Sequence, residues 1–157
     1  MWMDHVGNFE NAARSKFSFL TGEKGFEEPT ASLFRDLSVD FNHPEKGWRV
    51  SICWERSWLL PLVSLDATES EEASTHQLTY LLRLMKISVD SKAFPLCEKL
   101  SRKIVPGIGE MWTHFRRKKE LLLEYPRFLD AHAEALRREY DALWTLACDP
   151  ATPQWVL

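Results

Sequence analysis

Apolar and polar side chains alternate with a period of two between Leu33 and Leu65. This period is typical of a β-strand with one buried face and one face exposed to solvent. Three runs follow the pattern, and short polar segments separate them, so the sequence predicts an antiparallel meander. The predicted strands are Leu33–Phe41, Trp48–Glu55 and Trp58–Leu65. The third run is apolar on both faces, and its Pro61 favours an edge strand or a bulge because proline lacks an N–H.

Apolar residues spaced three and four positions apart predict helices on both sides of this meander. The first helix is predicted over His5–Leu20 and should end at Gly22. An acidic loop at Asp66–Ser74 should follow the last strand, and later helices are predicted over Thr75–Ile87, Pro95–Ile104, Gly109–Tyr125 and Pro126–Ala147. Strands grouped early and helices grouped late predict an α+β fold. In this fold an N-terminal helix precedes a three- to four-stranded antiparallel sheet, and a helical C-terminal half packs on one face of that sheet.

The chain has 157 residues, a length that suits one domain with a core of its own. We expect a helix and the sheet over residues 1–66, a helical part over 75–147 and a tail over 148–157. Cys53, Cys97 and Cys148 are odd in number and widely spaced, which argues against a disulfide scaffold and against a thiolate zinc site. We expect reduced and mostly buried thiols. The sequence contains no signal-peptide pattern and no apolar run of the ~20 residues that a membrane helix needs, so we expect a cytoplasmic protein without a membrane partner.

The familiar catalytic motifs are missing from the sequence. It contains no G-x-S-x-G nucleophile, no H-E-x-x-H metal pair and no glycine-rich phosphate loop that follows a strand. We therefore expect a protein that is not an enzyme and that needs no cofactor and no metal. The basic run Arg116–Lys119 spreads around more than one helical turn, which favours a solvated helix face over a nucleic-acid site.

Acidic residues are concentrated in the first half of the chain. Residues 1–72 contain 7 Lys and Arg against 13 Asp and Glu, a net charge of −6, whereas residues 73–157 contain 13 against 10, a net charge of +3. An acidic surface can attract a basic protein partner, although acidic residues can also serve solubility alone. The candidate partner-binding residues are the strand and loop acids and two tryptophans that could be exposed: Asp36, Asp40, Trp48, Glu55, Trp58, Asp66, Glu69, Glu71 and Glu72.

Residues 17–65 contain an ordered set of short motifs. The segment Phe17–Leu20 is followed by Gly25-Phe26, then by the strand residues Leu37–Asn42 and Trp48–Glu55. This order resembles small bacterial immunity proteins of polymorphic or contact-dependent toxin systems. The resemblance implies a cytoplasmic, non-catalytic protein that binds one toxin tightly and blocks its active site.

Two other functions remain open from the sequence. One is a small structural or adaptor protein that oligomerises through its C-terminal helices. The other is an enzyme with dispersed catalytic residues, which would require a pocket that gathers His43 or His76 with Glu55.

Overall fold

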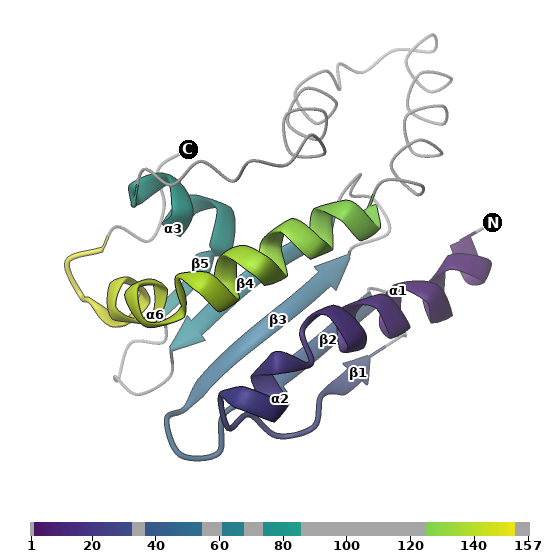
Figure 1. The fold of residues 1–157 in the computed structure, drawn as a ribbon, viewed down its shortest axis with the longest axis horizontal. Coiled ribbons are helices and arrows are strands. Elements are labelled where there is room, and N and C mark those ends of the chain that lie inside the picture. Colours follow the sequence, from purple (N-terminus) through teal and green to yellow (C-terminus); the bar gives the residue numbers. More distant parts are fainter. Residues whose placement is uncertain (1, 33–36, 55–60, 68–73, 86–124, 153–157) are drawn as a thin grey trace, which may run out of the picture.

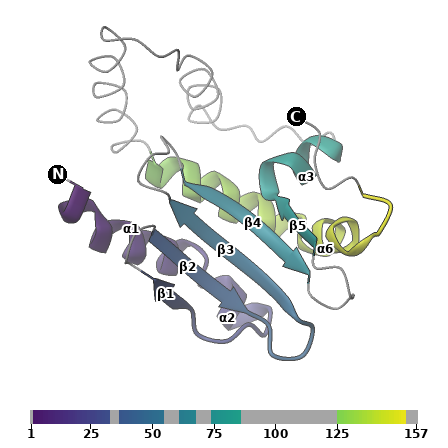
Figure 2. The same ribbon diagram turned by 180° about the vertical axis from the view of Figure 1, so that it is seen from behind.

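The protein has the predicted α+β architecture, with helices on one face of an antiparallel sheet (Figure 1). The computed structural model describes residues 2–32, 37–54, 61–67, 74–85 and 125–152. Helices α1, α2 and α6 and the helical residues 125–138 all lie on the same side of the sheet (Figures 1 and 2). The predicted helix over Pro95–Ile104 and residues 109–124 of the next predicted helix lie outside the described residues.

The sheet is an antiparallel meander in which every strand pairs with the next one along the chain. It has five strands where the sequence predicts three to four: β1 Thr30–Ser32, β2 Leu37–Asn42, β3 Trp48–Trp54, β4 Leu62–Ala67 and β5 Ser74–Gln77. Strand β4 lies between β3 and β5, so it is an internal strand. Pro61 immediately precedes it, at a position where the missing N–H removes no hydrogen bond from the ladder.

Two predictions around the end of the sheet are wrong. Asp66 was expected in a loop, but it belongs to β4 and pairs with Arg49 of β3. Residues 75–77 were expected in a helix, but they belong to β5, and helix α3, Leu78–Leu84, begins only after them. The pairing of β5 with β4 satisfies its backbone groups, and four residues are too few to display a strand period of their own.

The predicted first and last helices are each divided in two. Helix α1, Trp2–Lys16, ends before α2, Phe19–Glu23, and Gly22 lies inside α2 rather than at its end. Residues 125–138 are helical, and a turn at Glu139 separates them from α6, Tyr140–Cys148. Each break keeps the apolar residues on both of its sides in contact with the same core.

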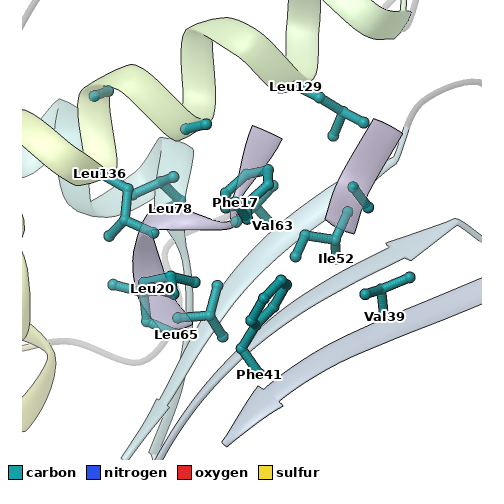
Figure 3. Packing of buried hydrophobic residues seen from close by; sticks show 14 of the residues in the cluster. Phe17, Leu20, Val39, Phe41, Ile52, Val63, Leu65, Leu78, Leu129 and Leu136 are labelled. Atoms are coloured by element: carbon teal, nitrogen blue, oxygen red, sulfur yellow. The ribbon is translucent and has the colours of Figure 1, made fainter. Parts of the chain in front are cut away.

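The core lies between the sheet and the helical layer, and it contains the residues that the period of two selects. Val39, Ile52 and Val63 are neighbours across β2, β3 and β4, and Phe41, Val50 and Leu65 form the next row of the sheet. Leu20, Leu129 and Leu136 cover these rows from the helices, and Phe17 covers them from the turn between α1 and α2 (Figure 3). The strands therefore carry their buried side chains on one face, as the sequence predicts.

We expect Gly25→Ala to lower the free energy of unfolding by about 1 kcal/mol. Gly25 has a positive φ of 77°, which a residue with a Cβ rarely adopts, and the added Cβ would lie 3.4 Å from Nε2 of His43. Gly22→Ala is the matched control, because a Cβ there meets nothing within 4 Å and alanine favours the helix that contains it. Urea unfolding of both variants measures the effect, and equal stabilities would contradict the prediction.

Candidate functional site

The face of the sheet that points away from the core carries mostly small and polar side chains. Successive strand residues point to opposite faces, so this face receives the residues between the core positions. Figure 2 views this side of the sheet, and no helix of the described chain crosses it. We call it the open sheet face, and its residues are Thr30, Ser32, Ser38, Asp40, Asn42, Arg49, Ser51, Cys53, Leu62, Ser64, Asp66, Thr75 and Gln77.

Asp40 lies near the middle of β2 on the open sheet face, where two hydroxyl groups hold its carboxylate. Oγ of Ser51 donates a hydrogen bond to Oδ1 of Asp40 at 2.6 Å, and Oγ of Ser38 donates to the same oxygen at 2.9 Å. Ser51 is the partner of Asp40 across β3, and Ser38 precedes Asp40 by two residues on its own strand. The carboxylate orientation is therefore set by neighbours on the sheet, which are themselves fixed by the strand ladder.

Asp66 and Arg49 form an ion pair between β4 and β3. Nε and Nη2 of Arg49 each lie 2.7 Å from Oδ2 of Asp66. Asp66 is only 4% exposed, whereas the side chain of Arg49 is 48% exposed. Oδ1 of Asp66 is buried and accepts no hydrogen bond in the described part of the chain. The pair therefore consists of a buried anion that depends on one half-exposed cation for compensation.

Removing the charge of Arg49 should lower the free energy of unfolding more than removing the charge of Asp66. We expect Arg49→Met to lower the free energy of unfolding by about 2 kcal/mol, because it leaves the buried Asp66 carboxylate without its partner. Asp66→Asn should cost less, and the double variant should be more stable than Arg49→Met alone. Chemical unfolding of the three variants completes a double-mutant cycle. An Arg49→Met variant as stable as the native chain would show that water already compensates Asp66.

The structure places some of the predicted partner-binding residues together and separates another from them. Asp40 and Asp66 both lie on the open sheet face, although Asp66 is buried rather than exposed in a loop. Trp48 lies on the opposite, helix-covered face, so it does not join them. The other predicted positions lie outside the described residues: Asp36, Glu55, Trp58, Glu69, Glu71 and Glu72.

The expectation of an exposed Trp48 is wrong, because its indole is half-buried at the end of the sheet. It stacks on Trp144 of α6 with ring centroids 4.4 Å apart and planes only 6° apart. Nζ of Lys46 lies 4.5 Å from the Trp48 ring, and His43 contacts the ring edge-on. Tyr140 packs nearby, and burial raises the pKa of its phenol to about 12. These contacts join the β2–β3 turn to α6 and favour a structural role for Trp48.

The described histidines and cysteines have local explanations. His43 lies at the turn between β2 and β3, and its Nδ1 accepts hydrogen bonds from the backbone N–H groups of Glu45 and Lys46 at 3.2 Å. His76 is buried in β5, two residues before helix α3 begins, and burial lowers its pKa although the charge of Asp66 acts in the opposite direction. Cys53 is half-buried and Cys148 is exposed, so the expectation of buried thiols is wrong for both, whereas Cys97 lies outside the described residues.

Three residues that shape this site were not among the predicted partner-binding residues, namely Arg49, Ser38 and Ser51. The strand period does place all three on the same face of the sheet as Asp40 and Asp66. Their pairing partners, however, depend on the register between strands, which a single strand does not encode. The arrangement can recognise charged and hydrogen-bonding groups on another molecule.

The described residues offer neither a metal-binding cluster nor a membrane-spanning helix. No group of three or more His, Cys, Asp and Glu side chains in these residues could hold a metal ion. In the same residues, no helix combines the length and the apolar character needed to span a membrane. No protein-family model, curated protein or solved structure matches the chain.

Proposed function

We propose that this chain is an immunity-type protein, which binds a cognate bacterial toxin stoichiometrically and neutralises it without catalysing a reaction. The observation that carries the proposal is the open sheet face. It is a broad polar surface that no described helix covers, and it contains Asp40 and the Arg49–Asp66 pair in fixed positions. The order of motifs over residues 17–65 supports the same function through its resemblance to toxin immunity proteins.

A rigid sheet suits tight binding for a physical reason. The side chains of the open sheet face stand on strands whose other face is locked into a hydrophobic core. Such a surface loses little conformational entropy when a partner binds, so more of the contact energy appears as affinity. Its small side chains, such as Ser38, Ser51 and Ser64, also let the backbone of a partner approach the sheet closely.

The described C-terminal helices offer less for oligomerisation. Most large apolar residues of this region pack into the core of their own chain, and Leu146 is partly buried against the same core. The following are at most 5% exposed: Phe128, Leu129, Leu136, Leu143 and Trp144. A stable helical interface needs an apolar face that remains free. The open sheet face is therefore the better candidate for contact with another protein.

The test is co-expression with the products of the open reading frames next to this gene in the native host, among which the proposal requires a toxin. We expect the chain to restore growth and to form a one-to-one complex in size-exclusion chromatography with light scattering. Absence of both protection and complex would overturn the proposal. A homo-oligomer that does not bind the toxin would favour the adaptor function instead.

A pair of arginine variants locates the binding face. Ser64→Arg places a long charged side chain on the open sheet face between Ser51 of β3 and Gln77 of β5, and we expect it to abolish protection. Glu134→Arg is the matched control, because Glu134 is exposed on the helical layer. Circular dichroism must show that both variants are folded. Loss of protection in Glu134→Arg alone would place the toxin on the helices and would contradict this use of the sheet.

A further inference from the structure

The charged residues of the open sheet face do not balance one another. In the described part of the chain this face contains two carboxylates, Asp40 and Asp66, and one cation, Arg49. Arg49 uses both Nε and Nη2 to bind Asp66. Because Arg49, the cation of the described open sheet face, is bound to Asp66, Asp40 has no cationic partner among the described residues.

The residues directly beside Asp40 on the open sheet face are polar and uncharged, and the guanidinium of its diagonal neighbour Arg49 is bound to Asp66. Thr30 lies opposite it on β1 and Ser51 lies opposite it on β3, while Ser38 and Asn42 flank it along β2. The two serine hydroxyls bind Oδ1, so they fix the carboxylate but bring no positive charge. Asp40 is half-buried and remains reachable from solvent. The fold therefore presents an oriented anion whose charge no cation of the described residues neutralises.

We infer that Asp40 is the receptor for a lysine or arginine side chain of the protein partner, an inference that rests on the proposed function. A hydrogen bond between a carboxylate and a cationic donor is shorter and stronger than a neutral one, and here the acceptor is already in place. The cation would also balance the net negative charge of this face. Asp66 is only 4% exposed and is already paired with Arg49, whereas Asp40 is half-buried and can be reached from solvent, so Asp40 is the preferred position for the cation.

The same charges argue against a nucleic-acid ligand at this face. Phosphate groups bind where lysine and arginine side chains are free, but the arginine of the described open sheet face is already paired with Asp66. The uncompensated charge at Asp40 would repel a phosphate. A basic protein surface is therefore the complementary partner.

The first experiment uses the toxin and compares Asp40→Asn with Glu134→Gln. Both variants remove one negative charge, and asparagine keeps an oxygen that can accept the hydrogen bonds of Ser38 and Ser51. We expect Asp40→Asn to weaken toxin binding about tenfold and to reduce its dependence on salt, as for the loss of an interfacial charge pair. Glu134→Gln should leave the affinity for the toxin and its dependence on salt unchanged. Calorimetric titration at low and at high salt measures these quantities.

The second experiment needs no toxin and uses a short peptide of alternating arginine and glycine as the probe. Titration into the native chain should shift the backbone amide resonances of Ser38, Asp40 and Ser51 in a ¹⁵N spectrum. The shifts should disappear in Asp40→Asn and persist in Glu134→Gln. Shifts elsewhere, or equal loss in both variants, would overturn the inference.

The two experiments separate the inference from the function on which it rests. If the toxin binds the native chain and Asp40→Asn equally well, the role of Asp40 is overturned and the proposed function stands. If the toxin does not bind the native chain but the peptide binds at Asp40, the proposed function fails and cation binding at this position remains supported.

Discussion

Replacing Trp54 with alanine should lower the free energy of unfolding by about 4 kcal/mol, which is typical of a large aromatic residue removed from a core. Trp54 is the last residue of β3 and is 0% exposed. Its ring centroid lies 5.5 Å from that of Phe9 in α1 and 5.1 Å from that of Tyr125 in the C-terminal helical region. The indole thus connects the first helix, the sheet and the C-terminal half, and alanine would leave a cavity between all three.

Urea unfolding followed by circular dichroism measures this effect without depending on tryptophan fluorescence. Trp54→Phe is the matched control, because phenylalanine keeps an aromatic ring against Phe9 and Tyr125 and leaves a smaller cavity. We expect its loss of stability to be clearly smaller than that of Trp54→Ala. Equal and small losses in the two variants would mean that the helices are not docked on this residue.

Acidification should destabilise the protein through His132. This residue is 1% exposed, and its Nδ1 lies 2.7 Å from the backbone oxygen of Phe128, which can only accept a hydrogen bond. Burial lowers the pKa of His132 from 6.5 to about 4, although the hydrogen bond with Phe128 acts in the opposite direction. The native state therefore keeps a neutral imidazole over a pH range in which the unfolded chain binds a proton.

The sign of the pH effect follows from this difference. Because the pKa of His132 is lower in the native state, the unfolded state binds more protons between pH 6.5 and about 4. The contribution of His132 to stability is fully present above this window and is lost as the pH falls through it. We expect a loss of about 2 kcal/mol between about pH 7 and about pH 5, and about 3 kcal/mol in total near pH 4.

Unfolding of the native chain and of His132→Gln as a function of pH isolates this contribution. Glutamine does not titrate, so the variant should lose less stability on acidification. His76 remains in both proteins and contributes with the same sign, because burial also lowers its pKa. Parallel stability curves for the two proteins would show that His132 is not buried in its neutral form.

The sequence predicts the inner and outer faces of the central strands well, because these depend on a local period. Val50, Ile52 and Trp54 alternate with Arg49, Ser51 and Cys53, and the first set is buried whereas the second set is not. The same reasoning places Asp40 on the outer face of β2. Helical spacing likewise identifies Leu136 and Trp144 as core residues. Each of these inferences needs only the geometry of one element.

The candidate site is harder to predict because its contacts join different strands. The sequence identifies Asp40 and Asp66 as acids, but Arg49 becomes the partner of Asp66 only through the register of β3 with β4. Trp48 similarly becomes half-buried because Trp144, from the far end of the chain, stacks on it. The strand β5 forms because an edge of β4 is available to it. A local pattern contains no information about such neighbours.

By itself, the sequence determined the α+β class, the meander and the face of each central strand that enters the core, because side-chain direction follows from backbone periodicity within a few residues. Only the tertiary structure decided the fifth strand, the burial of Asp66 and Trp48, and the isolation of the Asp40 charge from any described cation. These features depend on which distant residues meet, and chain folding sets that through strand register and helix packing.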